Sequence, residues 1–242
     1  MKTSRVPRHH HNMVLTRLEV VVIVAVLAIV FGLMIPGLIQ DGAKANRITC
    51  NNYLKNIGLA YRIFATDNQG LYPFQIPTNG MPGKDQDTST SGGTLEFASD
   101  AGSAWRHFVV LSNELSSPKL LFCPADKERT AARHFSQFTN HFSQFTDNRF
   151  LSYTVGMSAT DDRPQSVLSG DRNLRLDGAP LSNVVVSFRS NANVAFDQRI
   201  HVNAGNLLLG DGSVQQVTSD RLREQINDAV IATREPHKLV IP

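Results

Sequence analysis

The feature that most constrains the fold of this chain is an apolar run near its N-terminus. Sixteen consecutive residues, Val20 to Ile35, carry no polar side chain, and the run continues to Ile39. About twenty helical residues span about 30 Å, the thickness of a bilayer core. Residues 1–17 carry basic side chains and no acid, so the positive-inside rule places them in the cytoplasm. The sequence therefore predicts a transmembrane segment over 15–40, with a cleaved signal peptide or a buried core helix as the alternatives.

Composition excludes several other classes of protein. The net charge of +3 and the pI of about 9.0 come from the basic N-terminus, so they do not indicate a nucleic-acid partner. Two cysteines are too few for a disulfide-dense scaffold or a four-cysteine zinc site. Nucleophile-elbow, zinc-protease and phosphate-loop motifs are missing from the sequence. We expect no nucleic acid, no cofactor, no metal and no enzymatic activity.

A carboxylate directly before the apolar run gives the first indication of a family. The string from Leu15 to Leu38 resembles the N-terminus of type IV pilins and type II secretion pseudopilins. In that family a leader ends in Gly, and the mature chain has Glu as its fifth residue and a helix-kinking Pro as its twenty-second. Counted from Leu15, Glu19 and Pro36 match both positions, which implies roles in assembly. The resemblance also implies cleavage and methylation at Val14 and Leu15 by a prepilin peptidase, although Val14 stands where the family has Gly.

A second pattern follows the apolar run. Spacings of four and three residues place one apolar stripe on a helix that ends in the cluster at 67–70; the stripe is Cys50, Leu54, Ile57, Tyr61 and Phe64. The stretch 47–73 resembles a hallmark of a large bacterial group of pilin-like proteins. We expect an amphipathic continuation of the first helix over 41–70.

The middle of the chain has fewer signals. Residues 75–104 read as a long loop, and the apolar segment 118–123 predicts a short strand that Pro124 ends. A near-identical heptad repeats at 134–140 and 141–147, which favours a duplication within an exposed loop over a coiled coil.

Cys50 and Cys123 lie in two motifs that resemble the pilin-like group. A disulfide between them would close a loop of about 70 residues and stabilise the fold by about 4 kcal/mol in the loop-entropy model. An extracytoplasmic location favours the bridge. Two buried free thiols are the alternative, because Cys50 belongs to the apolar stripe.

The C-terminal third predicts strands, a hairpin and a helix. Runs at 184–188 and 194–196 read as strands, Asp211 and Gly212 predict a tight hairpin, and a helix is expected over 219–233. The string from His201 to Gly212 resembles the C-terminal motif of the pilin-like group. We expect a structural role for His201, Asp211 and Gly212, with His201 packed near the turn. The string SGDRN at 169–173, also similar to that group, is the nearest approach to an acidic site.

These observations predict an α+β fold of the type IV pilin-like kind. One long N-terminal helix, half transmembrane and half amphipathic, would pack on a small antiparallel sheet with long loops. The domains would be a basic cytoplasmic leader at 1–14, the transmembrane segment at 15–40, the amphipathic helix at 41–70 and an extracytoplasmic head at 71–242. The resemblance implies a bacterial inner-membrane, single-pass protein that joins like subunits in a pilus or secretion pseudopilus, with its head in the periplasm or outside the cell. The alternative is an unprocessed anchored protein with a binding head.

Overall fold

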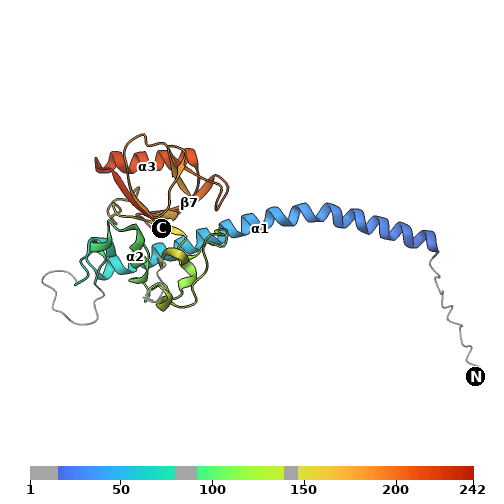
Figure 1. Ribbon diagram of the computed structural model, residues 1–242, viewed down its shortest axis with the longest axis horizontal. Helices are drawn as coiled ribbons and strands as arrows, with labels where there is room; N and C mark the ends of the chain where they lie inside the picture. The colour runs from blue at the N-terminus through green and yellow to red at the C-terminus, as the bar shows by residue number, and fades with distance from the viewer. Residues whose placement is uncertain (1–15, 80–91, 139–146) are drawn as a thin grey trace, which may run out of the picture. The chain divides into compact units, whose positions relative to one another are not determined.

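A computed structural model describes residues 16–79, 92–138 and 147–242, with only the helical backbone at 32–41 (Figure 1). Val14 and Leu15 lie outside the described residues, and so does the side chain of Pro36. The chain divides into two compact units, Met1–Gly42 and Ala43–Pro242. Each unit is described by itself, and the second is called the head.

The first unit contains the beginning of helix α1, which spans Arg17–Asp67. Every side chain from 16 to 31 is exposed, including Leu18, Val21 and Phe31. Among the described residues, no helix is long and apolar enough to cross a membrane. This finding contradicts the expected transmembrane segment and the expected single-pass inner-membrane location.

The head is built on a six-stranded antiparallel sheet in the order β5-β9-β1-β2-β7-β8. Its strands are β1 (Tyr153–Gly156), β2 (Val167–Asp171), β5 (Val184–Phe188), β7 (Ala204–Leu209), β8 (Val214–Thr218) and β9 (His237–Ile241). A second antiparallel sheet has the order β4-β3-β6, with strands β3 (Leu174–Leu176), β4 (Ala179–Pro180) and β6 (Val194–Phe196). The predicted strands at 184–188 and 194–196 are confirmed.

The large sheet separates two apolar cores. Along β7, Leu208 belongs to the core shared with α1, while Leu207 and Leu209 belong to the core shared with α3 (Ser219–Thr233). Side chains alternate between the faces of a strand, so a continuous apolar run fits a strand covered on both sides. Figure 1 shows α3 on one side of the strands, with α2 (Arg106–Val109) and the end of α1 on the other.

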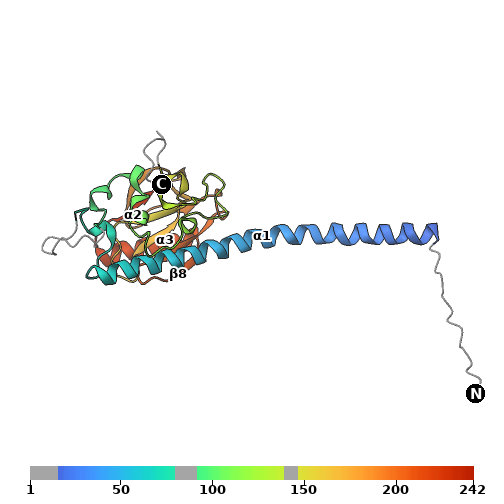
Figure 2. The same cartoon turned by 90° about the horizontal axis from the view of Figure 1, so that it is seen from below.

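The part of α1 that belongs to the head forms one of these covering layers. All five residues of the predicted apolar stripe are at most 3% exposed, which confirms the stripe. Gly58 lets the helix approach β7, because a Cβ there would meet Leu208 Cδ1 at 2.6 Å. Figure 2 shows this layer with β8 beside it, and Arg62 donates to the Asp211 carbonyl oxygen at 2.8 Å. The helix ends at Asp67, before Gln69 and Gly70 adopt positive φ angles.

The expected fold class is wrong in its sheet as well as in its transmembrane half, and one predicted strand is a helical turn. The head contains a six-stranded and a three-stranded sheet instead of one small sheet. The predicted strand at 118–123 is a 3-10 helix, η4 (Pro118–Leu121), because Pro118 favours a helical first turn and the Ser117 hydroxyl accepts from the Lys119 N–H. Five other short 3-10 helices lie between α1 and β1 in the described part of the chain: η1 (Pro73–Gln75), η2 (Leu95–Phe97), η3 (Ala101–Ser103), η5 (Phe135–Gln137) and η6 (Asp147–Phe150).

The hairpin and the last helix agree with the sequence. β7 and β8 pair across a turn in which Gly212 has a φ of 82° and the Asp211 carboxylate accepts from the Ser213 N–H. Helix α3 covers the predicted residues and ends where Arg234 adopts a left-handed conformation, two residues before Pro236. The second heptad copy, including His141, lies largely outside the described residues.

Candidate functional site

A disulfide joins α1 to the middle segment of the chain. Cys50 and Cys123 are bonded with their Cα atoms 5.2 Å apart, and both residues are fully buried. Cys50 belongs to the buried stripe of α1, and Cys123 follows η4. The helix and the loop region therefore meet at a covalent link, across 73 residues of sequence.

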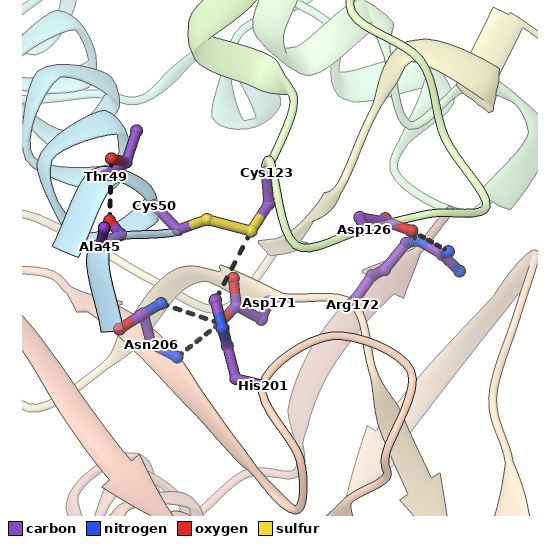
Figure 3. Close-up of a disulfide and its surroundings, with 9 residues drawn as sticks. All are labelled: Ala45, Thr49, Cys50, Cys123, Asp126, Asp171, Arg172, His201 and Asn206. Atoms are coloured by element: carbon purple, nitrogen blue, oxygen red, sulfur yellow. Dashed lines mark hydrogen bonds and ion pairs between the residues drawn. A yellow bond between two sulfur atoms is a disulfide. The ribbon is translucent and has the colours of Figure 1, made fainter. Parts of the chain in front are cut away.

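His201 lies against this disulfide. Its Nε2 atom is 3.5 Å from Cys123 Sγ and 3.6 Å from Asp171 Oδ2, and its side chain is 3% exposed. The loop that carries it turns sharply into β7, because Val202 and Asn203 both have φ angles near +50° to +60°. Figure 3 shows the imidazole between the sulfur and the carboxylate.

Asp171 ends β2 and is fully buried. Its Oδ2 accepts from the Asn206 backbone N–H at 2.7 Å and from Asn206 Nδ2 at 3.0 Å. Its Oδ1 is buried and has no hydrogen-bond partner among the residues that the structure describes. Burial raises the pKa of Asp171 to about 7, against the lowering effect of the Asn206 hydrogen bonds.

The neighbouring imidazole titrates in the opposite sense. Burial, together with the positive charge of Arg47, lowers the pKa of His201 to about 4. His201 is therefore neutral at pH 7, so its contact with Asp171 is that of a neutral ring with a carboxyl group that is close to its own titration point. A fully charged ion pair is not formed there.

Cys50, Cys123, Asp171 and His201 are together called the disulfide group, and a charged network lies next to it. Arg172 donates two hydrogen bonds to the Asp126 carboxylate, at 2.7 and 2.8 Å, and one to Glu128 at 2.7 Å. Arg172 and Asp126 are almost completely buried, and burial alone would lower the pKa of the guanidinium, but its two acidic partners raise it. Removing either partner of such a buried pair would leave an uncompensated charge in the interior, which is strongly destabilising. The pair fixes the turn after Cys123 against the end of β2.

A pocket of about 440 Å³ opens beside the disulfide group. His201 forms part of its wall, and the basic side chains Lys44, Arg47 and Lys127 form another part. The pocket gives solvent and small molecules a route to the imidazole, while the disulfide itself stays covered.

The ligand-type atoms of Cys50, Cys123 and His201 all lie within 4.8 Å of one another. In the bonded state the two sulfurs offer no thiolate, which is the form that binds metals. The group therefore acts here as a covalent and hydrogen-bonded junction that links α1, the segment after η4, β2 and the loop before β7.

The other residues singled out from the sequence lie elsewhere. Asp211 and Gly212 form the turn at the far end of β7, about 20 Å along the strand from His201. The expectation that His201 packs near that turn is thus wrong. In the first unit, the Glu19 carboxylate accepts from the Thr16 N–H at 3.5 Å, and the Thr16 hydroxyl accepts from the Glu19 N–H at 3.3 Å. This reciprocal pair is a capping box at the start of α1.

Sequence reasoning missed how the site is assembled. The string that contains Asp171 and Arg172 and the motif that contains Cys123 were both visible in the sequence, but nothing in it gave them a common role. Asn206 was not singled out at all. The only signal in the sequence was that several of these polar residues lie in strings similar to those of the pilin-like group. Which of these strings come close together is decided by the fold.

Comparison with known proteins adds no identification. Searches against protein-family models, curated proteins and solved structures find no match to this chain.

Proposed function

We propose that this chain is a structural subunit of a filament of the type IV pilus or type II secretion pseudopilus kind, and that it assembles through its N-terminal helix. The observation that carries this proposal is the exposed apolar surface of α1. From Leu18 to Phe31 the large apolar side chains are about half exposed or more, and the helix is apolar on all sides. Soluble monomers rarely expose such a surface, and it is typical of an interaction site.

Like subunits are suitable partners for this surface. Burying a Val, Leu, Ile or Phe side chain contributes about 1.5–3 kcal/mol, so a helix of this composition gains stability when it packs among copies of itself. The head keeps its own cores, which leaves it free to form the outer layer of an assembly. In this function the chain acts by association and not by catalysis.

Glu19 has two roles to separate. In the single chain it closes the capping box with Thr16. In the family that the sequence resembles, the matching Glu pairs with the free N-terminal amine of a neighbour. By that analogy Glu19 would contact the Leu15 amine of the next subunit after removal of residues 1–14.

Two substitutions test the assembly role. Glu19→Gln keeps an acceptor for the cap and removes the charge, whereas Glu19→Ala removes both. We expect both variants to lose filaments, and only Glu19→Ala to lower the helicity of the single subunit. Filament yield is measured by sedimentation and electron microscopy, and helicity by circular dichroism. Wild-type filament yield from Glu19→Gln would refute the charge pair.

The N-terminal mass of the protein in its native source provides an independent test. A chain that begins at Leu15, with a methylated amine, would supply the partner that Glu19 requires. A chain that retains residues 1–14 would have no free amine at Leu15 and would contradict this mode of assembly.

A further inference from the structure

We infer that the disulfide group of the head is a redox-controlled metal site: when the Cys50–Cys123 bond is reduced, both thiolates, His201 and Asp171 bind one Zn²⁺, and re-formation of the bond releases it. The inference is independent of filament assembly. It rests on four potential ligands from four separate segments that the fold holds in one buried place.

The spacing around His201 is close to that of ligands on a tetrahedral ion. Ligands bound to zinc at about 2.0–2.3 Å in a tetrahedron lie roughly 3.3–3.8 Å from each other. His201 Nε2 is already 3.5 Å from Cys123 Sγ and 3.6 Å from Asp171 Oδ2. Of these four described residues, only Cys50, Cys123 and His201 have ligand atoms that all lie within 4.8 Å of one another. Binding would therefore require two adjustments: the sulfurs separate to about the same distance after reduction, and the Asp171 carboxylate moves closer to them.

The carboxylate has a free position for a metal. Asn206 occupies Asp171 Oδ2 with two hydrogen bonds, while the buried Oδ1 has no partner among the described residues. The Asn206 bonds would fix the orientation of the carboxylate, as hydrogen-bonded groups commonly do around zinc ligands. An acceptor left unpaired in the interior is costly, and an ion would satisfy it.

The charges and the access also fit. Zn²⁺ with two thiolates, one carboxylate and a neutral imidazole carries a net charge of about −1. Arg47 lines the adjoining pocket, acts electrostatically on both His201 and Asp171, and has a buried Nε without a hydrogen-bond partner in the described part of the chain. Its charge would balance the site. The pocket reaches His201, which gives the ion a route from solvent.

The redox step balances with a thiol reagent as the partner. A dithiol reduces the disulfide to two thiols and is itself oxidised to a disulfide, and Zn²⁺ then displaces the two thiol protons. In the reverse direction, an oxidised disulfide reagent accepts two electrons from the zinc-bound thiolates. It leaves as two thiolates, the Cys50–Cys123 bond forms, and Zn²⁺ is released.

The test uses the full chain in both redox states. Oxidised and dithiol-reduced protein are freed of metal and of excess reductant and are titrated with Zn²⁺ against a coloured chelator, and with Co²⁺ as a spectroscopic probe. We expect one ion per reduced chain and none at this site in the oxidised chain. We also expect a thiolate-to-cobalt charge-transfer band with tetrahedral ligand-field bands. Adding oxidised glutathione should release one zinc for each disulfide formed.

Variants distinguish a folded site with four ligands from simple zinc binding by two exposed thiols. His201→Ala and Asp171→Asn should each weaken zinc binding by the reduced chain more than about tenfold and alter the cobalt spectrum. His134→Ala, a histidine in another part of the head, should change neither. If the reduced chain unfolds and still binds, the His201→Ala and wild-type cobalt spectra would be identical. That result, or a reduced chain that binds no zinc, would overturn the inference.

Discussion

The two parts of helix α1 follow opposite rules. Residues 20–31 are apolar on every side and are exposed on every side, whereas residues 43–67 carry one apolar stripe, and that stripe is buried. The difference shows that apolar content alone does not decide which part of a helix enters a core. The amphipathic part has a polar face for solvent and a narrow apolar face that matches the sheet, so a single head can cover it. The uniformly apolar part would need partners all round.

The largest expected effect comes from truncating matched leucines in the two parts. Leu54→Ala removes a fully buried side chain and should lower the free energy of unfolding of the head by about 2–5 kcal/mol. Leu27 is 49% exposed, so Leu27→Ala should change that free energy by less than about 0.5 kcal/mol and reduce filament yield instead. Urea unfolding and sedimentation measure the two effects. An equal loss of head stability in both variants would contradict the difference between the two parts of α1.

Two glycines of α1 test the same difference in packing. A Cβ at Gly58 would meet the buried Leu208 side chain, so Gly58→Ala should destabilise the head by about 1–2 kcal/mol even after its gain in helix propensity. A Cβ at Gly42 would meet nothing within 4 Å, and Gly42→Ala should raise local helix stability by up to about 1 kcal/mol. Thermal unfolding and amide exchange along the helix distinguish the two. A stabilised head in Gly58→Ala would contradict the close approach of helix and sheet.

The third comparison is a change in pH dependence that only the head should show. Because burial raises the pKa of Asp171 to about 7, the stability it contributes is present below its ordinary pKa of 3.8 and is lost as pH rises through 7. His107 and His201 have the opposite sign, because burial lowers both pKa values from 6.5 to about 4, so their contribution is lost as pH falls.

Asp171→Asn should remove the opposing contribution. The stability of the oxidised variant should therefore rise more steeply from pH 4 to pH 7 than that of the wild type, by at most about 1.4 kcal/mol per pH unit. Urea unfolding at several pH values measures the slope. The same slope in variant and wild type would show that Asp171 is ionised throughout this range.

Much of the head could be predicted where local chemistry was sufficient. The stripe on α1, the Asp211-Gly212 turn and the helix at 219–233 depend on periodicity and on turn residues, which act over a few positions. The predicted strand at 118–123 failed because Ser117 and Pro118 begin a helical turn there, a local preference that the apolar run concealed.

The candidate site depended on contacts between distant segments. Cys50, Cys123, Asp171 and His201 were all visible as chemically capable residues, yet the sequence left free thiols open and placed His201 at the wrong end of β7. The alternation of a strand tells which face a side chain takes, but it does not tell which loop lies beyond the end of that strand. Only the packing of α1 and η4 against the sheet brings these groups together.

By itself, the sequence determined the apolar character of the first helical segment, the amphipathic stripe that follows it and the turns of the C-terminal third, because these properties arise from neighbouring residues. The tertiary structure alone decided the separation of the head into two sheets and two cores, the joining of Cys50 to Cys123, and the burial of Asp171 beside His201. Those features depend on pairing and packing between residues that are tens of positions apart in the sequence. The free energy of the whole core determines which of these residues come into contact.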